Sequence, residues 1–99
     1  MARRHDDHEQ DRDKFLIDCK AVIDLANRSV EKLETKKNAA DESGKAELDQ
    51  QINTIKSKRD ALQGKINDIR NTDVMKWGDH KAAAQSAMDD LNRESKSVS

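Results

Sequence analysis

The chain of 99 residues carries 19 Lys and Arg against 20 Asp and Glu. Its formal net charge of −1 argues against a general nucleic-acid binder, which needs a basic surface to displace counterions from phosphates. With no proline, three glycines and two aromatic residues, it also lacks the composition of a turn-rich β fold, so we expect one all-α domain.

Residues 1–9 are charged and show no apolar period, which predicts a disordered tail ahead of a single domain over residues 10–96. The tail contains the sequence His5-Asp6-Asp7-His8, whose side chains are metal-ligand types. No further ligand cluster accompanies them in the sequence, so we interpret this segment as solvated and expect no metal site. Neither a transmembrane-length apolar run nor a signal-peptide core is present, which predicts a cytoplasmic protein unless a leader has been removed.

The first predicted helix covers about residues 10–40. Apolar residues in it recur at alternating steps of three and four, the pattern of a coiled-coil seam. The seam residues are Leu16, Cys19, Ile23, Ala26, Val30, Leu33, Lys37 and Ala40, and the stripe is widened by Phe15, Val22 and Leu25. Because the widening lies in the first half of the helix, we expect that half to face two other helices.

Small polar residues at 38–44 interrupt this pattern, and a seam shifted by one residue follows in a predicted helix over about residues 44–70. The members of this second seam are Leu48, Ile52, Ile55, Arg59, Leu62, Ile66 and Ile69. Such a break can be a tight turn or a skip within one longer helix. Gly44 and its small polar neighbours favour the turn, with Ser43 or Asp41 as the N-cap of the second helix.

A third helix over about residues 73–96 is predicted by a further seam, again shifted by one residue. Its members are Val74, Trp77, Lys81, Ala84, Met88, Leu91, Ser95 and Val98. The junction sequence Asn71-Thr72-Asp73 offers favourable N-cap residues. Since short connections make neighbouring helices antiparallel, the sequence predicts an antiparallel three-helix bundle, up-down-up, with coiled-coil-like heptad seams. Its best-packed end should unite the start of the first helix, the end of the second and Trp77.

Three cations stand inside the apolar seams, namely Lys37, Arg59 and Lys81. Their stems can pack while the charges remain in water. Alternatively they set the helix register, since a polar seam residue penalises wrong alignments. A hairpin folded near residue 42 places Arg59 opposite about residue 25, and we therefore expect an ion pair between Arg59 and Asp24.

Trp77, Gly78 and His80 are the candidate partner-contact residues. Tryptophan is enriched at the energetic centres of interfaces, and an adjacent glycine lets another backbone approach closely. His80 lies one turn further along and offers a pH-sensitive contact. The alternative is that Trp77 fills the core of a bundle poor in aromatics. Cys19 is expected to be a buried structural thiol, with an intermolecular disulfide as the alternative.

Catalytic motifs are missing from the sequence. It has no Gly-rich phosphate loop, HExxH, CxxC or nucleophile elbow, and no Glu-x-x-His pairs of the kind that di-metal bundles use. We therefore expect a protein that is not an enzyme, with no cofactor, no metal and no small-molecule substrate.

The helix pattern resembles a group of small bacterial coiled-coil proteins that are described as apolipoprotein-like and functionally uncharacterised. The likeness is carried by residues 46–52 and 62–66, then Trp77, Ala84, Met88 and Leu91. Proteins of this group also place one tryptophan at the head of a final amphipathic helix, behind a long charged one. The likeness covers roughly residues 12–95, although this chain has less alanine and glutamate and more asparagine and serine. It implies a helical bundle and no defined activity.

Two functions fit this composition. The first is a protein–protein interaction or structural module that binds a protein partner or self-associates, because the seams use nearly every large apolar residue and leave a surface rather than a pocket. The alternative is an amphipathic lipid-surface binder whose bundle opens on a membrane. The second helix has a narrow apolar stripe and mixed charges, which is less typical of such helices.

Overall fold

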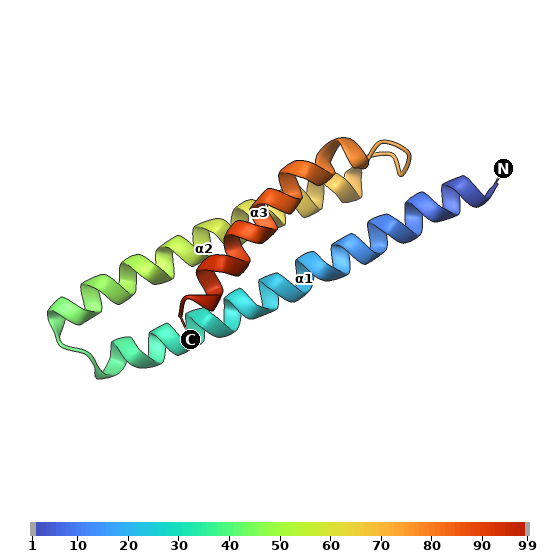
Figure 1. The fold of residues 1–99 in the computed structure, drawn as a ribbon. Helices are drawn as coiled ribbons and strands as arrows, with labels where there is room; N and C mark the ends of the chain where they lie inside the picture. Colours follow the sequence, from blue (N-terminus) through green and yellow to red (C-terminus); the bar gives the residue numbers. More distant parts are fainter. Residues whose placement is uncertain (1, 99) are drawn as a thin grey trace.

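The computed structural model describes residues 2–98, with their side chains from residue 9 onward. It contains three helices, α1 (Ala2–Ala39), α2 (Glu42–Asn71) and α3 (Gly78–Lys96). The helices run up, down and up, and each packs against the other two (Figure 1). The predicted all-α three-helix bundle is therefore confirmed.

The bundle is elongated, with extents of 62 × 17 × 16 Å and a radius of gyration of 16.6 Å. A globular chain of this length would have a radius of gyration of about 13 Å. The bundle is longer than a globular chain because its helices differ in length, since α1 has 38 residues and α3 has 19. Beyond the end of α3, the hairpin of α1 and α2 continues as two helices to its tip (Figure 1).

The first connection is a tight turn at Ala40 and Asp41, so the break near residue 41 is not a skip. Asp41 is the N-cap of α2, and its Oδ1 accepts a hydrogen bond from the Gly44 N–H at 2.8 Å. Because Asp41 rather than Ser43 caps the helix, α2 begins at Glu42. A Cβ on Gly44 would lie 3.1 Å from the Ala40 Cβ, so the turn has little room for a side chain there.

The second connection is longer than predicted, and the expected start of the third helix near residue 73 is wrong. Residues 74–77 form turns, and α3 begins at Gly78. The Oδ1 of Asp73 accepts from the Met75 N–H at 3.1 Å, and its carbonyl accepts from the Lys76 N–H at 2.8 Å. An aspartate that bonds its own backbone two residues on competes with helix formation, which delays the helix by one turn.

The first helix also differs from its predicted bounds, because α1 begins at Ala2 rather than near residue 10. Residues 2–9 contain no proline or glycine to interrupt a helix. The disorder expected for the tail in solution stays a prediction. The side chains of His5 and His8, which belong to the metal-ligand types of the tail, precede residue 9 and lie outside the part of the chain whose side chains the structure describes.

One apolar cluster runs through the bundle. Its buried members are Phe15, Cys19, Ala26, Val30, Leu33, Ile52, Ile55, Leu62, Ile66, Ile69, Trp77, Ala84, Met88 and Leu91. The rings of Phe15 and Trp77 lie 5.7 Å apart, so the start of α1 meets the start of α3 as predicted. Leu16 and Ile23 are only half-buried, because they line an open hollow between α1 and α2, whereas Phe15 and Cys19 are buried.

A pair of serines sits inside the core between α1 and α3. The Ser29 hydroxyl donates to the carbonyl of Ser95 at 3.0 Å, and both residues are buried. A buried hydrogen bond of this kind aligns the two helices, because a shift along either axis leaves polar groups unpaired. Ser95 is one of the predicted seam residues, whereas Ser29 was not predicted to lie in the core.

Gly64 offers a test of the helix assignment. It lies on an exposed stretch of α2, and a Cβ there would meet nothing within 4 Å. We expect Gly64→Ala to raise the free energy of unfolding by about 1 kcal/mol, since alanine restricts the unfolded chain and favours helix. Urea unfolding followed by far-UV circular dichroism measures this. The matched control, Gly44→Ala, should raise the stability by less than Gly64→Ala does, because its Cβ would press on Ala40 and Asp41 at 3.1 and 3.2 Å. A loss of stability in Gly64→Ala would contradict the assignment.

Candidate functional site

Trp77, the main candidate for a partner contact, lies in the core. Only 4% of its surface is exposed, and its ring packs against Phe15 at an interplanar angle of 36°. The Lys81 Nζ stands 5.6 Å from the centre of the Trp77 ring, so this seam cation interacts with an aromatic face. The core-filling interpretation of Trp77 is favoured, and a partner would reach only the residues around it.

Gly78 and His80 begin α3 directly beside the buried tryptophan. Gly78 is exposed, and a Cβ there would meet nothing within 4 Å. His80 is half-buried, and its N–H closes a turn on the Trp77 carbonyl at 2.9 Å. Both residues are therefore accessible at the start of α3, next to the buried Trp77 ring.

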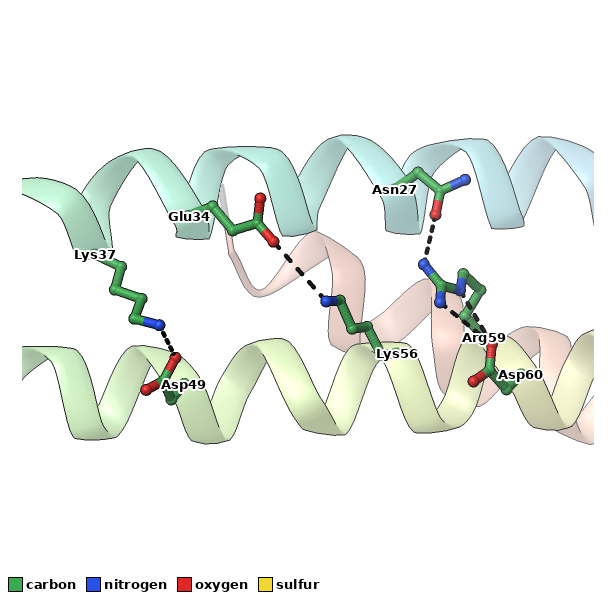
Figure 2. Close-up of polar contacts among 7 residues, drawn as sticks. All are labelled: Asn27, Glu34, Lys37, Asp49, Lys56, Arg59 and Asp60. Carbon is green, nitrogen blue, oxygen red and sulfur yellow. Dashed lines mark hydrogen bonds and ion pairs between the residues drawn. The ribbon is translucent and has the colours of Figure 1, made fainter.

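The other two seam cations link α1 to α2 (Figure 2). Lys37 forms an ion pair with Asp49, and Arg59 donates from Nη1 to the Asn27 Oδ1 at 3.0 Å. The Lys37 side chain is 37% exposed and the Arg59 side chain 27% exposed. Their stems are thus partly covered while their charges cross the helix interface at its edge. A sliding of either helix would break both contacts, which supports a role in register.

The predicted ion pair between Arg59 and Asp24 is wrong. Arg59 contacts Asn27 on α1 and Asp60 on its own helix, at 3.0 and 3.3 Å (Figure 2). The midpoint of the Asn27–Arg59 pair is residue 43, whereas the prediction assumed a fold near residue 42. The turn itself lies at residues 40 and 41, so this pairing reflects how far the two helices are shifted along each other. A one-residue change in the midpoint moves the opposite residue by two, from about 25 to 27.

Lys58 forms a clamp between α2 and α3 that the sequence analysis missed. Its Nζ lies 3.0 Å from the Asp90 Oδ1 and 3.6 Å from the Glu94 Oε2. The hydrogen bond to Asp90 raises the pKa of Lys58 above its usual value of 10.5, and Glu94 contributes through its charge. The signal available in the sequence was the spacing of Asp90 and Glu94, four residues apart on one face of α3.

We expect Lys58→Met to lower the free energy of unfolding by about 1 kcal/mol at neutral pH and low salt, the upper range for exposed ion pairs. Because folding raises this pKa, the clamp contributes fully below pH 10.5 and is lost as the pH rises through the folded value. Denaturant unfolding at neutral and at high pH measures this. The difference in unfolding free energy between Lys58→Met and the wild type should be smaller at high pH. Lys56→Met is the control, since its partner Glu34 lies 3.9 Å away (Figure 2). Equal losses in the two variants would contradict the assignment.

Cys19 is a free, fully buried thiol. Burial raises its pKa to about 11, and the neighbouring Asp18 adds to the increase. Since the thiolate is the reactive form, the thiol is unreactive at neutral pH. These properties match the expected structural thiol, and a disulfide between chains would require the bundle to open.

A groove runs between α1 and α2, and no residue of α3 lines it. Two adjoining hollows share Leu16 and Arg70, and the remaining lining residues are Arg12, Asp13, Ile17, Lys20, Ile23, Asp24, Gln63 and Ile66. Ile17 is 67% exposed, and the sequence analysis missed it. It could have been found as an isoleucine adjacent to a seam position but outside the apolar stripe.

The described side chains, residues 9–98, contain no group of three His, Cys, Asp or Glu placed to hold a metal ion. Within the same part of the chain, no helix is both long and apolar enough to cross a membrane. Comparison with family models, with curated proteins and with solved structures finds no match to this chain. The site is therefore interpreted from its own geometry.

Proposed function

We propose that this protein is a protein–protein interaction or structural module, acting through the outer faces of a three-helix bundle and not as an enzyme. One observation supports it most. Among residues 9–98, Ile17 and Met75 are the exposed large apolar side chains, at 67% and 50%, while the other large apolar side chains are buried or half-buried. A bundle built in this way offers charged helical faces with a few apolar contact points, which suits a macromolecular partner.

The start of α3 is the first surface to test for a protein partner. Gly78 is open to solvent, so a long side chain there would block an approaching partner without disturbing the core. Affinity capture should compare the wild-type protein with the Gly78→Arg variant. We expect the wild type to recover the same binding protein in repeated experiments and the variant to lose it. Equal recovery by both proteins would move the contact elsewhere, and repeated failure to recover any specific protein would overturn the proposal.

The alternative, a lipid-surface binder, is favoured only by the amphipathic helices. Opening the bundle on a membrane would expose the core around Trp77 and break the Ser29–Ser95 and Lys58–Asp90 contacts. The interaction module predicts that anionic phosphatidylglycerol vesicles leave the helicity and the Trp77 fluorescence unchanged. Co-flotation with vesicles and a shifted tryptophan emission would favour the lipid binder instead.

Three expectations from the sequence belong to the same proposal. They are the cytoplasmic location, the coiled-coil character of the seams and the kinship with small bacterial apolipoprotein-like proteins. The charged helical surfaces support the first, and the seam residues on all three helices support the other two.

A further inference from the structure

We propose that the groove between α1 and α2 binds α1 of a second copy of this chain, in antiparallel orientation. The proposal rests on the function proposed above and names its partner and site. The apolar centre of the groove consists of Leu16 and Ile17, and Ile66 lines the adjoining hollow that shares Leu16. Ile17 is 67% exposed and Leu16 half-buried, so a second helix would cover apolar surface that water now reaches.

Asp13 and Lys20, the two charged residues that flank Leu16 and Ile17 on α1, are complementary to the same two residues of a second copy. Asp13 and Lys20 lie seven residues apart, one on each side of Leu16 and Ile17, which places all four on one stripe of α1. Both charged residues are exposed, and the Asp13 side chain stays 59% exposed although Arg12 lies 3.5 Å away. Opposite charges at the two ends of an apolar centre are what a two-fold symmetric contact requires.

An antiparallel arrangement of the two α1 helices forms the Asp13–Lys20 pair twice, once on each side of the symmetry axis. With the symmetry axis between residues 16 and 17, Asp13 faces Lys20 of the second copy, and Lys20 faces Asp13 of the second copy. Leu16 and Ile17 then face each other across the axis. A parallel arrangement would instead place Asp13 against Asp13 and Lys20 against Lys20, where like charges repel. The charges therefore select the antiparallel orientation.

The same pattern limits the length of the contact. One step further out, Glu9 would face Asp24 of the second copy, and two carboxylates repel each other there. The helices are thus expected to cross at the apolar centre and to diverge beyond one heptad. A contact of this size gives a weak dimer whose affinity falls as salt rises, because its ion pairs are exposed.

Sedimentation velocity from about 10 μM to about 1 mM at low salt tests the dimer, since this range brackets weak association. We expect the wild-type protein to shift from monomer to dimer across this range and to return to monomer in high salt. Ile17→Ser should weaken the dimer by about tenfold or more, because it removes the apolar centre. Met75→Ser is the matched control, since Met75 is also exposed but lies outside the groove, and it should leave the affinity unchanged.

Charge reversal tests the orientation. Asp13→Lys and Lys20→Glu should each weaken the dimer by about tenfold, and the double variant should recover the wild-type affinity to within about threefold. Circular dichroism of each variant confirms that the helices remain. A wild-type protein that stays monomeric throughout overturns the inference, as does a dimer that Ile17→Ser does not weaken or that the double variant does not restore. None of these results contradicts the proposed interaction module, because capture of a different protein that depends on Gly78 would still support that function.

Discussion

Replacing Ile66 by alanine should lower the free energy of unfolding by about 2–5 kcal/mol, the range for a buried isoleucine truncated in a packed core. Ile66 is 3% exposed and lies in the same apolar cluster as Leu62 and Ile69. These neighbours belong to rigid helices that cannot close the space, so a cavity remains. Since domains of this size are stable by about 5–15 kcal/mol, the variant should unfold at much lower urea concentration.

Leu48 provides the comparison for Ile66. It lies near the tip of the hairpin, where α3 no longer covers α1 and α2, and it is only half-buried (Figure 1). Leu48→Ala should therefore cost about half as much as Ile66→Ala or less, because part of its surface is already in water. Urea unfolding followed by circular dichroism measures both variants. An equal loss of unfolding free energy in the two variants would mean that the tip of the hairpin is packed as tightly as the core around Ile66.

Replacing Trp77 by alanine should cost about 3–5 kcal/mol, because the largest side chain of the core would be lost. Its ring packs against Phe15 and carries the Lys81 ammonium on its face, and it anchors the start of α3. Trp77→Phe is the control, since it keeps a ring against Phe15 and should cost less than half as much. Thermal and urea unfolding by circular dichroism provide the measurement.

Tryptophan fluorescence checks the same assignment in the unaltered protein. Trp77 is the one tryptophan of the chain, and 4% of it is exposed. Its emission should therefore be shifted to shorter wavelength in the native state and move to longer wavelength on unfolding. A native emission already at the wavelength of a solvated tryptophan would place Trp77 on the surface, and the interpretation of Trp77 as a core residue would then be wrong.

Local patterns were enough to predict the helices and most of the core. Apolar spacing placed Ile52, Ile55, Leu62, Ile66 and Ile69 on one stripe of α2, and all five are buried. Asp41 was one of two N-caps that the sequence offered, beside Ser43, because a carboxylate accepting from a first-turn N–H is a local interaction, and the structure selects Asp41. The start of α3 was not, because Asp73 is equally suited to cap a helix or to close a turn, and the backbone adopts the turn.

Residues of the candidate site were predictable only in part. Lys37, Arg59 and Lys81 stood out as cations among apolar residues, and each contacts a partner at a helix interface or on the Trp77 ring. Their partners were harder to predict, because an antiparallel pairing moves by two residues for each residue of error in its midpoint, and the midpoint at residue 43 does not coincide with the turn at residues 40 and 41. The choice of Asn27 over Asp24 therefore depended on how far α1 and α2 are shifted along each other.

The sequence by itself determined that the chain forms three amphipathic helices, where the break between the first two falls, and which side chains are apolar enough to enter a core. These properties follow from the helical period and from capping within a few residues, so they need no distant contact. The tertiary structure alone decided which stripe of α1 faces α3, how Ser29 meets Ser95, and that Ile17 stays at an open groove. These depend on the rotation and sliding of whole helices against one another, which many distant side chains set together.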